Sequence, residues 1–252
     1  MTDLAVEPDP AGQGVTSTAS RGTRILGAAT IASMAVLLLY AFGITSPDAQ
    51  LGESIRIMYV HVPTISLTYL LMVLNAGCGV FYLRRRSEFA DLLGHAAGEL
   101  AVLFLGFSIV SGALWGRITW GAYWVWDARL TTTAVLFLLY VGYLAVRAVQ
   151  AEPQVRGTRS AIVGIAAALL IPIVHKSVDW WSSLHQQRTL FGTLDPEIGG
   201  TQLFTLLFSF VAFGFLAAWL LVHRFRVAWL AERVAERELE FAIAERRSEA
   251  QS

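Results

Sequence analysis

Residues 115–129 read WGRITWGAYWVWDAR and lie between two long apolar stretches. They contain four tryptophans and a tyrosine, with glycines between them and an aspartate near the end. If this segment is a helix, one face carries the side chains spaced i, i+3, i+4 and i+7, namely Trp120, Tyr123, Trp124 and Asp127. An aromatic belt at a membrane surface would explain one or two such tryptophans. Four within so short a segment favour a flat platform for a large planar ligand.

The whole chain has the composition of an integral membrane protein. Of its 252 residues, 55% are hydrophobic and 15% are charged, and the mean hydropathy is +0.55. Stretches nearly free of charge recur six times, at residues 25–45, 62–83, 99–116, 130–147, 160–178 and 202–222. A helix needs roughly 20 residues to cross a bilayer, and helices satisfy their own backbone hydrogen bonds in lipid. The sequence therefore predicts an all-α integral membrane protein, built as a six-transmembrane-helix bundle.

The fifth stretch is the weakest of the six as a span, because only sixteen residues lie between Arg159 and Lys176. An uncharged helix of this length covers only about 24 Å, against a hydrocarbon core of about 30 Å. We expect its helix to continue through His175 toward Trp180 and Trp181.

The distribution of basic residues predicts the orientation in the membrane. If the connecting segments alternate between the two sides, fourteen of the 19 Lys and Arg residues share one side with both termini. By the positive-inside rule this side is the cytoplasm. Three outer segments then face the periplasm, at residues 46–61, 117–129 and 179–201. Six of the eight tryptophans belong to this side.

Two tails flank the membrane domain, which we place at residues 23–223. Residues 1–22 are mostly polar and lack the basic start of a signal peptide, so we expect a disordered cytoplasmic tail. Residues 224–252 alternate arginines and acids at helical spacing, which predicts a charged cytoplasmic helix.

Two histidines are expected at the outer face. His61 lies in MYVHVP, at the start of the second apolar stretch, and His175 lies in IPIVHKSVDWWSSLHQ, at the outer end of the fifth. Imidazole binds the iron of a porphyrin, and two imidazoles can bind it from opposite faces. His185 is also on the outer side and is a third possible ligand. His95 and His223 fall on the inner side, and we interpret them as structural.

The outer segments also contain the other groups that a haem site needs. Candidates for aromatic walls are Trp115, Trp120, Tyr123, Trp124 and Trp126. Candidates for cations that pair with the haem propionates are Arg129, Arg56 and Arg188. Asp127 is expected to cap or brace the platform, through Arg129 or a backbone donor; direct contact with the ligand is the alternative.

Other functions find less support in the sequence. With Cys78 as the single cysteine, the chain can form no intrachain disulfide and has no Cys-x-x-Cys-His motif, so it is not itself a c-type cytochrome. It contains no P-loop and none of the common hydrolase or metalloprotease motifs. A membrane b-type cytochrome linked to quinone would favour deeper pairs of histidines. A small-solute permease would need polar residues near the middle of several spans, and these are few.

The segment WGAYWVWDARLT resembles the tryptophan-rich "WWD" signature of haem-handling proteins in cytochrome c biogenesis, with the WWD segment at residues 115–130. Together with MYVHVP, IPIVHKSVDWWSSLHQ and the six expected spans, it is similar to the haem exporter protein C (CcmC) family over roughly residues 25–222. Tyr123 stands where the signature usually has the first tryptophan of its pair. Since tyrosine can still stack, we expect a tuned affinity for haem rather than a loss of binding.

This resemblance implies both a site and a function. Such proteins hold haem b at the periplasmic face of the bacterial inner membrane, with two axial histidines that map to His61 and His175. The segment from Trp115 to Arg129 would cradle the porphyrin. The haem passes to a periplasmic haem chaperone for c-type cytochrome maturation and becomes covalently attached there. The expected partners are this chaperone, ABC transporter subunits, a small single-span helper protein and the lipid bilayer, and no nucleic acid. The resemblance leaves open whether the chain itself promotes the covalent step as an enzyme.

Overall fold

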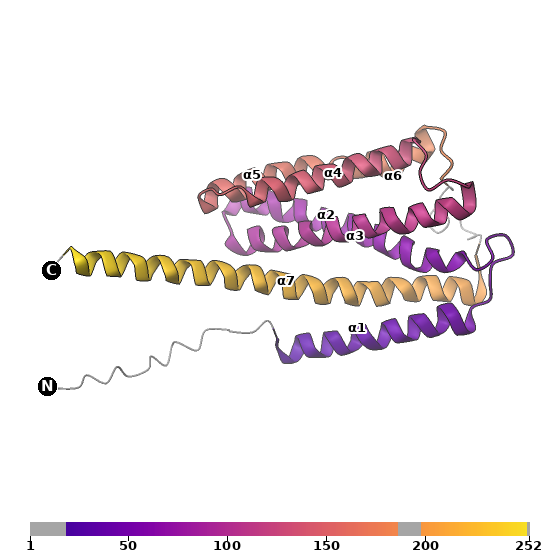
Figure 1. Cartoon of the computed structure of the whole chain (residues 1–252), viewed down its shortest axis with the longest axis horizontal. Coiled ribbons are helices and arrows are strands. Elements are labelled where there is room, and N and C mark those ends of the chain that lie inside the picture. The colour runs from indigo at the N-terminus through magenta and orange to yellow at the C-terminus, as the bar shows by residue number, and fades with distance from the viewer. Residues whose placement is uncertain (1–18, 186–197, 251–252) are drawn as a thin grey trace.

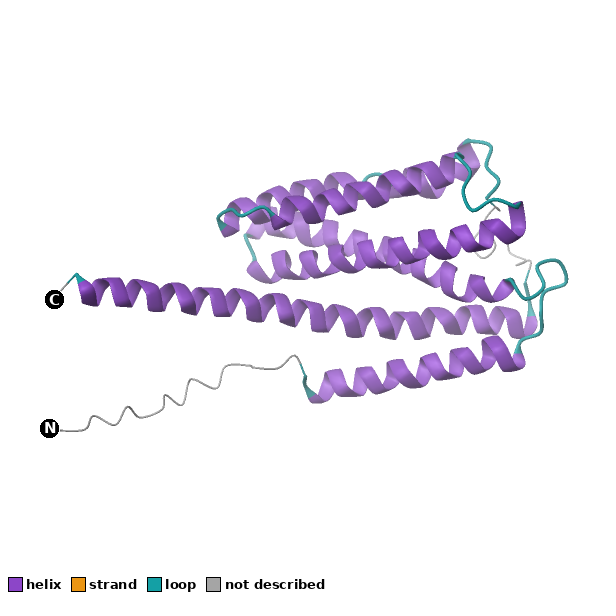
Figure 2. Ribbon diagram, in the orientation of Figure 1, coloured by secondary structure: helices purple, strands orange, loops and turns teal. Residues whose placement is uncertain are grey.

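The computed structural model describes residues 19–185 and 198–250, and over these ranges it contains helices and loops but no strand (Figure 2). Most of the expected N-terminal tail, and Arg188, lie outside the described residues. The elements in chain order are α1 (Arg21–Leu39), the π-helical turn η2 (Tyr40–Ile44), α2 (Ile55–Arg85), α3 (Glu88–Trp120), α4 (Ala128–Ala148), α5 (Pro153–Ala168), α6 (Ile171–Trp180) and α7 (Gly200–Glu249).

Within the described ranges, six helical segments are long and apolar enough to cross a membrane. They are Arg21–Ile44, Ile55–Arg85, Glu88–Trp120, Ala128–Ala148, Pro153–Trp180 and Gly200–Glu249. Each contains one of the six apolar stretches of the sequence, so the prediction of an all-α integral membrane protein with six spans is confirmed. The fifth span reaches Trp180 as expected, and it is interrupted between α5 and α6 at Leu169 and Leu170.

The helices form three groups across the bundle (Figure 1). α1 packs along α7 at one edge, α2 and α3 lie in the middle, and α4 packs against α5 and α6 at the other edge. α1 begins and α7 ends at the same end of the bundle, as an even number of crossings requires. The loops 45–54 and 121–127, and residues 181–185, lie at the opposite end. We call this the outer end, after its predicted orientation, and the other the inner end.

Small residues allow the central helices to approach closely. A Cβ atom at Gly98 of α3 would lie 2.5 Å from Cε1 of Tyr143, and one at Gly164 of α5 would lie 2.5 Å from Oδ1 of Asn75. Asn75 also donates through Nδ2 to the carbonyl of Gly94 at 2.7 Å. Lipid tails are as apolar as leucine, so close packing and buried hydrogen bonds of this kind hold membrane helices together.

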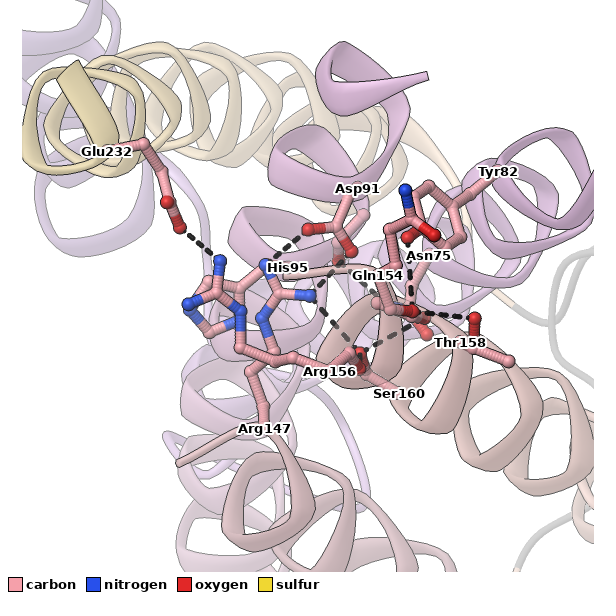
Figure 3. Close-up of polar contacts among 12 residues, drawn as sticks. Asn75, Tyr82, Asp91, His95, Arg147, Gln154, Arg156, Thr158, Ser160 and Glu232 are labelled. Atoms are coloured by element: carbon pink, nitrogen blue, oxygen red, sulfur yellow. Dashed lines mark hydrogen bonds and ion pairs between the residues drawn. The ribbon is translucent and has the colours of Figure 1, made fainter. Parts of the chain in front are cut away.

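A cluster of charged side chains joins α3, α4, α5 and α7 at the inner end (Figure 3). Arg147 of α4 makes two hydrogen bonds to the Asp91 carboxylate of α3, at 2.5 and 2.6 Å, and a third to Ser160 of α5 at 3.1 Å. The side chains of Arg147 and Asp91 are only 6% and 12% exposed. Arg156 of α5 pairs with Glu232 of α7. Bidentate pairing fixes both distance and orientation, so these contacts hold the inner ends of helices that are far apart in sequence.

Removal of the Asp91 carboxylate should destabilise the bundle. In Asp91→Ala the Arg147 guanidinium stays buried without its counter-charge, and we expect the free energy of unfolding to fall by about 3–5 kcal/mol. Unfolding of the purified protein in detergent micelles measures this change. Glu236→Ala is the matched control, because it removes a partner of Arg233 in a pair whose side chains are 54% and 42% exposed, and a change below about 1 kcal/mol is expected. Equal effects of the two substitutions would contradict the role of the buried pair.

Candidate functional site at the outer end

Residues 121–127 form a loop between two spans, as expected of an outer connecting segment, so the one-face arrangement that a helix would give the aromatic residues does not occur. α3 ends at Trp120 because Gly121 adopts a left-handed conformation with φ of 77°, which favours glycine. α4 begins at Ala128, after Asp127 in an extended conformation. Tyr123 and Trp124 therefore belong to a short connection between two spans, and we call residues 121–127 the tryptophan loop.

Arg117 and pairs of aromatic rings give this loop its shape. Nη1 of Arg117 donates to the carbonyl of Gly121, and the guanidinium lies 5.7 Å from the ring centroid of Tyr123, a cation–π contact. Trp124 and Trp126 meet edge to face, with ring centroids 5.6 Å apart. Tyr123 and Trp126 are 59% and 81% exposed. The loop thus presents large aromatic surface that the chain's own packing leaves uncovered, as at ligand-binding and membrane-contact surfaces.

Asp127 connects α4 to the chain that follows α6. Its Oδ1 accepts the N–H of Leu130 at 2.8 Å and caps α4, while its Oδ2 accepts the hydroxyl of Ser183 at 2.5 Å. The hydroxyl of Ser183 in turn accepts the N–H of His185 at 3.1 Å. The capping role expected of Asp127 is present, and Ser183 is its second partner.

Arg129 makes a second connection between α4 and α6. Its Nε donates to the hydroxyl of Ser177 at 3.1 Å, and its Nη2 donates to the carbonyl of His175 at 3.0 Å. His175 is exposed and occupies the middle of α6. Arg129 therefore holds the backbone that carries His175 next to the tryptophan loop. Its predicted contact with a haem propionate stays a prediction.

His61 lies in the second turn of α2, against α3. Its Nδ1 is 3.1 Å from the hydroxyl of Ser111, and its ring meets Trp115 edge to face with centroids 5.9 Å apart. Gly112 makes room for the ring, since a Cβ there would lie 2.9 Å from Cε1 of His61. His61 is partly exposed and Trp115 is buried. α3 thus fixes the ring from its Nδ1 side.

The structure brings the predicted site residues to one end of the molecule, in two groups. His61 and Trp115 belong to the closely packed pair α2 and α3. Asp127, Arg129 and His175 belong to α4 and α6, which pack against each other. The tryptophan loop connects the two groups. The ring of Trp120 lies 6.3 Å from that of His185, which places His185 at the same end.

The first outer loop is folded on itself. Arg56 pairs with Glu53 at 2.5 Å, donates to the carbonyl of Ala41 and lies 5.0 Å from the ring centroid of Phe42. These contacts hold Arg56, a candidate cation for haem, at the start of α2 against η2 and the loop between them. Asp48 accepts two backbone N–H groups at 2.8 Å, from Leu51 and Gln50, and these bonds lower the pKa of its carboxyl group.

The two inner histidines have partners away from the outer end. Nε2 of His95 lies 3.6 Å from Glu99, and the ring of His223 meets Trp219 edge to face at 5.3 Å. These contacts agree with the interpretation of both residues as structural.

The groups at the outer end fit a metal that a porphyrin already holds. Among the described residues, no cluster of three or more His, Cys, Asp or Glu side chains could hold a bare metal ion. Iron in a porphyrin has four ring nitrogens and needs only axial ligands from the protein, which His61 and His175 can supply. The buried indole N–H groups of Trp115 and Trp124 make no hydrogen bond within the described part of the chain. Buried donors are almost always paired, so both are suited to acceptors on a bound ligand.

The fold and the outer end define an integral membrane protein with six spans and a tryptophan-rich loop between histidine-bearing helices. Residues 10–240 match the model of the family Heme exporter protein C. Heme exporter protein C of Haemophilus influenzae is 34% identical over 203 residues, covering 81% of this chain and 82% of the relative. The protein of that name from Escherichia coli K12 is 33% identical over 205 residues, covering 80% and 81%. A ccmC-like mitochondrial protein of Marchantia polymorpha, named for cytochrome c biosynthesis, is 34% identical over 189 residues, covering 74% and 78%. The chain belongs to the Heme exporter protein C family.

Three residues of this region were not predicted from the sequence: Ser111, Arg117 and Ser183. Ser111 and Ser183 act through partners 50 and 56 positions away, and no local pattern marks such pairs. The role of Arg117 could have been predicted from the sequence, because Arg117 stands four residues before a glycine at which a helix can end.

Loss of the Asp127 carboxylate should loosen the junction of the tryptophan loop and α4. Asp127→Ala removes the cap and the bond to Ser183, and we expect a fall of about 0.5–2 kcal/mol in the free energy of unfolding. Limited proteolysis within residues 121–127 should become faster. Asp127→Asn is the control, since its amide oxygen can still cap α4. If Asp127→Ala is as stable and as resistant as the unaltered protein, the carboxylate does not brace the loop.

Proposed function

We propose that this protein binds haem b at the outer end and delivers it to a periplasmic haem chaperone for c-type cytochrome maturation. Membership of the Heme exporter protein C family supports haem handling, and the name of the Marchantia relative supports cytochrome c biosynthesis as its setting. One observation carries the site: His61, His175 and the tryptophan loop share one end of the bundle. In this proposal the membrane is the bacterial inner membrane and the outer end faces the periplasm.

Haem is the cargo in this proposal, and the chain supplies ligands and walls. Nε2 of His61 binds one face of the iron, because Nδ1 is engaged by Ser111. His175 binds the other face. The exposed rings of Tyr123 and Trp126 cover the porphyrin, and the indole N–H groups of Trp115 and Trp124 donate to its carboxylates. The chemistry of covalent attachment belongs to the haem and the chaperone.

The two ligands differ in how firmly they are held, and this difference suits transfer. His61 is packed between Ser111, Gly112 and Trp115. His175 is exposed on a helix of only ten residues. We infer that His61 retains the iron while His175 is the ligand that gives way when a histidine of the chaperone approaches. An open site of this kind can orient haem and still release it.

The remaining partners follow from the family and from the surface. We propose ABC transporter subunits and a small single-span helper protein as associates in the membrane. Exposed apolar residues along the spans, such as Ile31 and Leu103, suit contact with lipid or with such helices.

Substitution of either histidine should remove the axial ligation. In His61→Ala and His175→Ala we expect the bis-histidine absorption spectrum to be lost and covalent haem on a coexpressed chaperone to fall by at least about tenfold, since even partners of metal ligands contribute this much. Haem content, absorption spectra and haem staining of the chaperone measure these effects. His223→Ala is the control, because its ring packs on Trp219 at the inner end. Normal loading of the chaperone by both outer variants would refute the ligand assignment.

Replacement of an exposed platform residue should separate binding from folding. Trp126→Ala should change the free energy of unfolding by less than about 0.5 kcal/mol, because the side chain is 81% exposed. Its affinity for haem should fall about fivefold, the effect of losing one stacking contact of about 1 kcal/mol. Haem titration followed by tryptophan fluorescence measures this change. Phe241→Ala, at an exposed aromatic residue far along α7, should leave both properties unchanged. Unchanged haem affinity in Trp126→Ala would exclude this ring from the platform.

A further inference from the structure

The hydrogen bond between His61 and Ser111 is part of a buried network between α2 and α3. The hydroxyl of Ser111 lies 3.1 Å from Nδ1 of His61 and 3.2 Å from the carbonyl of Ser108. The hydroxyl of Ser108 lies 3.0 Å from that of Thr64, and the Thr64 hydroxyl is shared between the carbonyls of Val60 and His61, at 2.8 and 2.9 Å. Ser111, Ser108 and Thr64 are all buried. The ring and the backbone of His61 are therefore held by the same small network.

The direction of these hydrogen bonds follows from the chemistry of the groups. A carbonyl oxygen can only accept, and a hydroxyl has a single proton to donate. If Ser111 donates that proton to the Ser108 carbonyl, its oxygen is left to accept from His61. Nδ1 of His61 then carries the proton, and Nε2 carries the lone pair. Only an unprotonated nitrogen can bind a metal, so this tautomer is the one that can bind iron through Nε2.

Gly112 supports the same orientation from the adjacent position of α3. Any larger residue there would meet Cε1 of the imidazole, since a Cβ would lie 2.9 Å away. The edge-to-face contact with Trp115, at 5.9 Å, holds a further side of the ring. Packing thus confines the imidazole, and its hydrogen bond with Ser111 determines which ring nitrogen carries the proton.

We propose that Ser111 is a positioning residue for haem: it fixes the Nδ1-protonated tautomer of His61 and directs Nε2 toward the iron. This inference rests on the proposed function, and it assigns to Ser111 a role that acts through His61. A hydroxyl is a neutral acceptor and leaves the imidazole neutral, whereas a carboxylate at this place would raise its basicity as a ligand. A neutral ligand of moderate strength suits a protein that must pass its haem on.

The test uses the full-length protein in detergent micelles, loaded with ferric haem b, in five variants, one of which is His61→Ala. Ser111→Ala removes the acceptor, Ser111→Cys keeps the shape with a weak acceptor, Ser111→Thr restores the hydroxyl, and Ser209→Ala is the control. Ser209 is also buried and donates to a carbonyl three residues back, but it lies on α7 and donates to Leu206. The measurements are the rate of haem transfer to excess apomyoglobin and the low-spin electron paramagnetic resonance spectrum, which reports the axial ligands.

We expect Ser111→Ala to lose haem roughly tenfold faster, the lower range for partners of metal ligands, with an altered low-spin spectrum. Ser111→Cys should change in the same direction, which covers the case in which the alanine variant misfolds. Ser111→Thr and Ser209→Ala should match the unaltered protein. If Ser111→Ala and Ser111→Cys keep the original rate and spectrum while His61→Ala loses the low-spin signal, Ser111 does not position the ligand and the proposed function stands. If His61→Ala keeps that signal, the ligand assignment and the inference both fail.

Discussion

Lipid offers no hydrogen bonds to a backbone, and this constraint determines where the chain can place chemistry. Each crossing must be a helix, because each N–H and C=O within the bilayer has to find its partner inside the protein. Among the described residues, irregular backbone lies mainly at the ends of the bundle, and the break between α5 and α6 is the exception within a span. The turn at Gly121 and the cap at Asp127 lie at such an end, and they allow a tryptophan-rich connection to turn its rings outward. The regular spans and the irregular loop are two results of one requirement.

The site is assembled from two packed pairs of helices. α2 and α3 hold His61 through hydroxyl groups and a glycine, and α4 and α6 hold the backbone of His175 through Arg129. At the inner end the Asp91–Arg147 pair fixes α3 to α4, so the two pairs are joined at the end away from the ligand. At the outer end the short tryptophan loop connects them. The two pairs of helices are therefore connected at both ends of the bundle.

Much of the fold and the location of the candidate site could be predicted from the sequence, because hydropathy and the placement of arginines indicate directly how a chain crosses the membrane. The six spans, the extension of the fifth to Trp180, and the shared end of His61 and His175 follow from counting crossings. The sequence places residues 121–127 in an outer connection but does not decide whether they are helical, since a single glycine does not reveal whether a helix continues or ends there. The partners of Ser111 and Ser183 could not be predicted, because only the tertiary packing of the chain brings these residues together. Arg129 was recognised as a cation, but its bond to the His175 carbonyl depends on the angle between α4 and α6.

The interruption between α5 and α6 has a mechanical consequence. At this point the N–H groups of Leu169 and Leu170 reach back only three residues, at 3.3 and 3.1 Å, and Pro172 has no N–H to donate. The fifth span is therefore two helices in series, α5 and α6, instead of one continuous helix. Arg129 of α4 holds α6 through the carbonyl of His175. The placement of the His175 imidazole therefore depends on a helix other than its own.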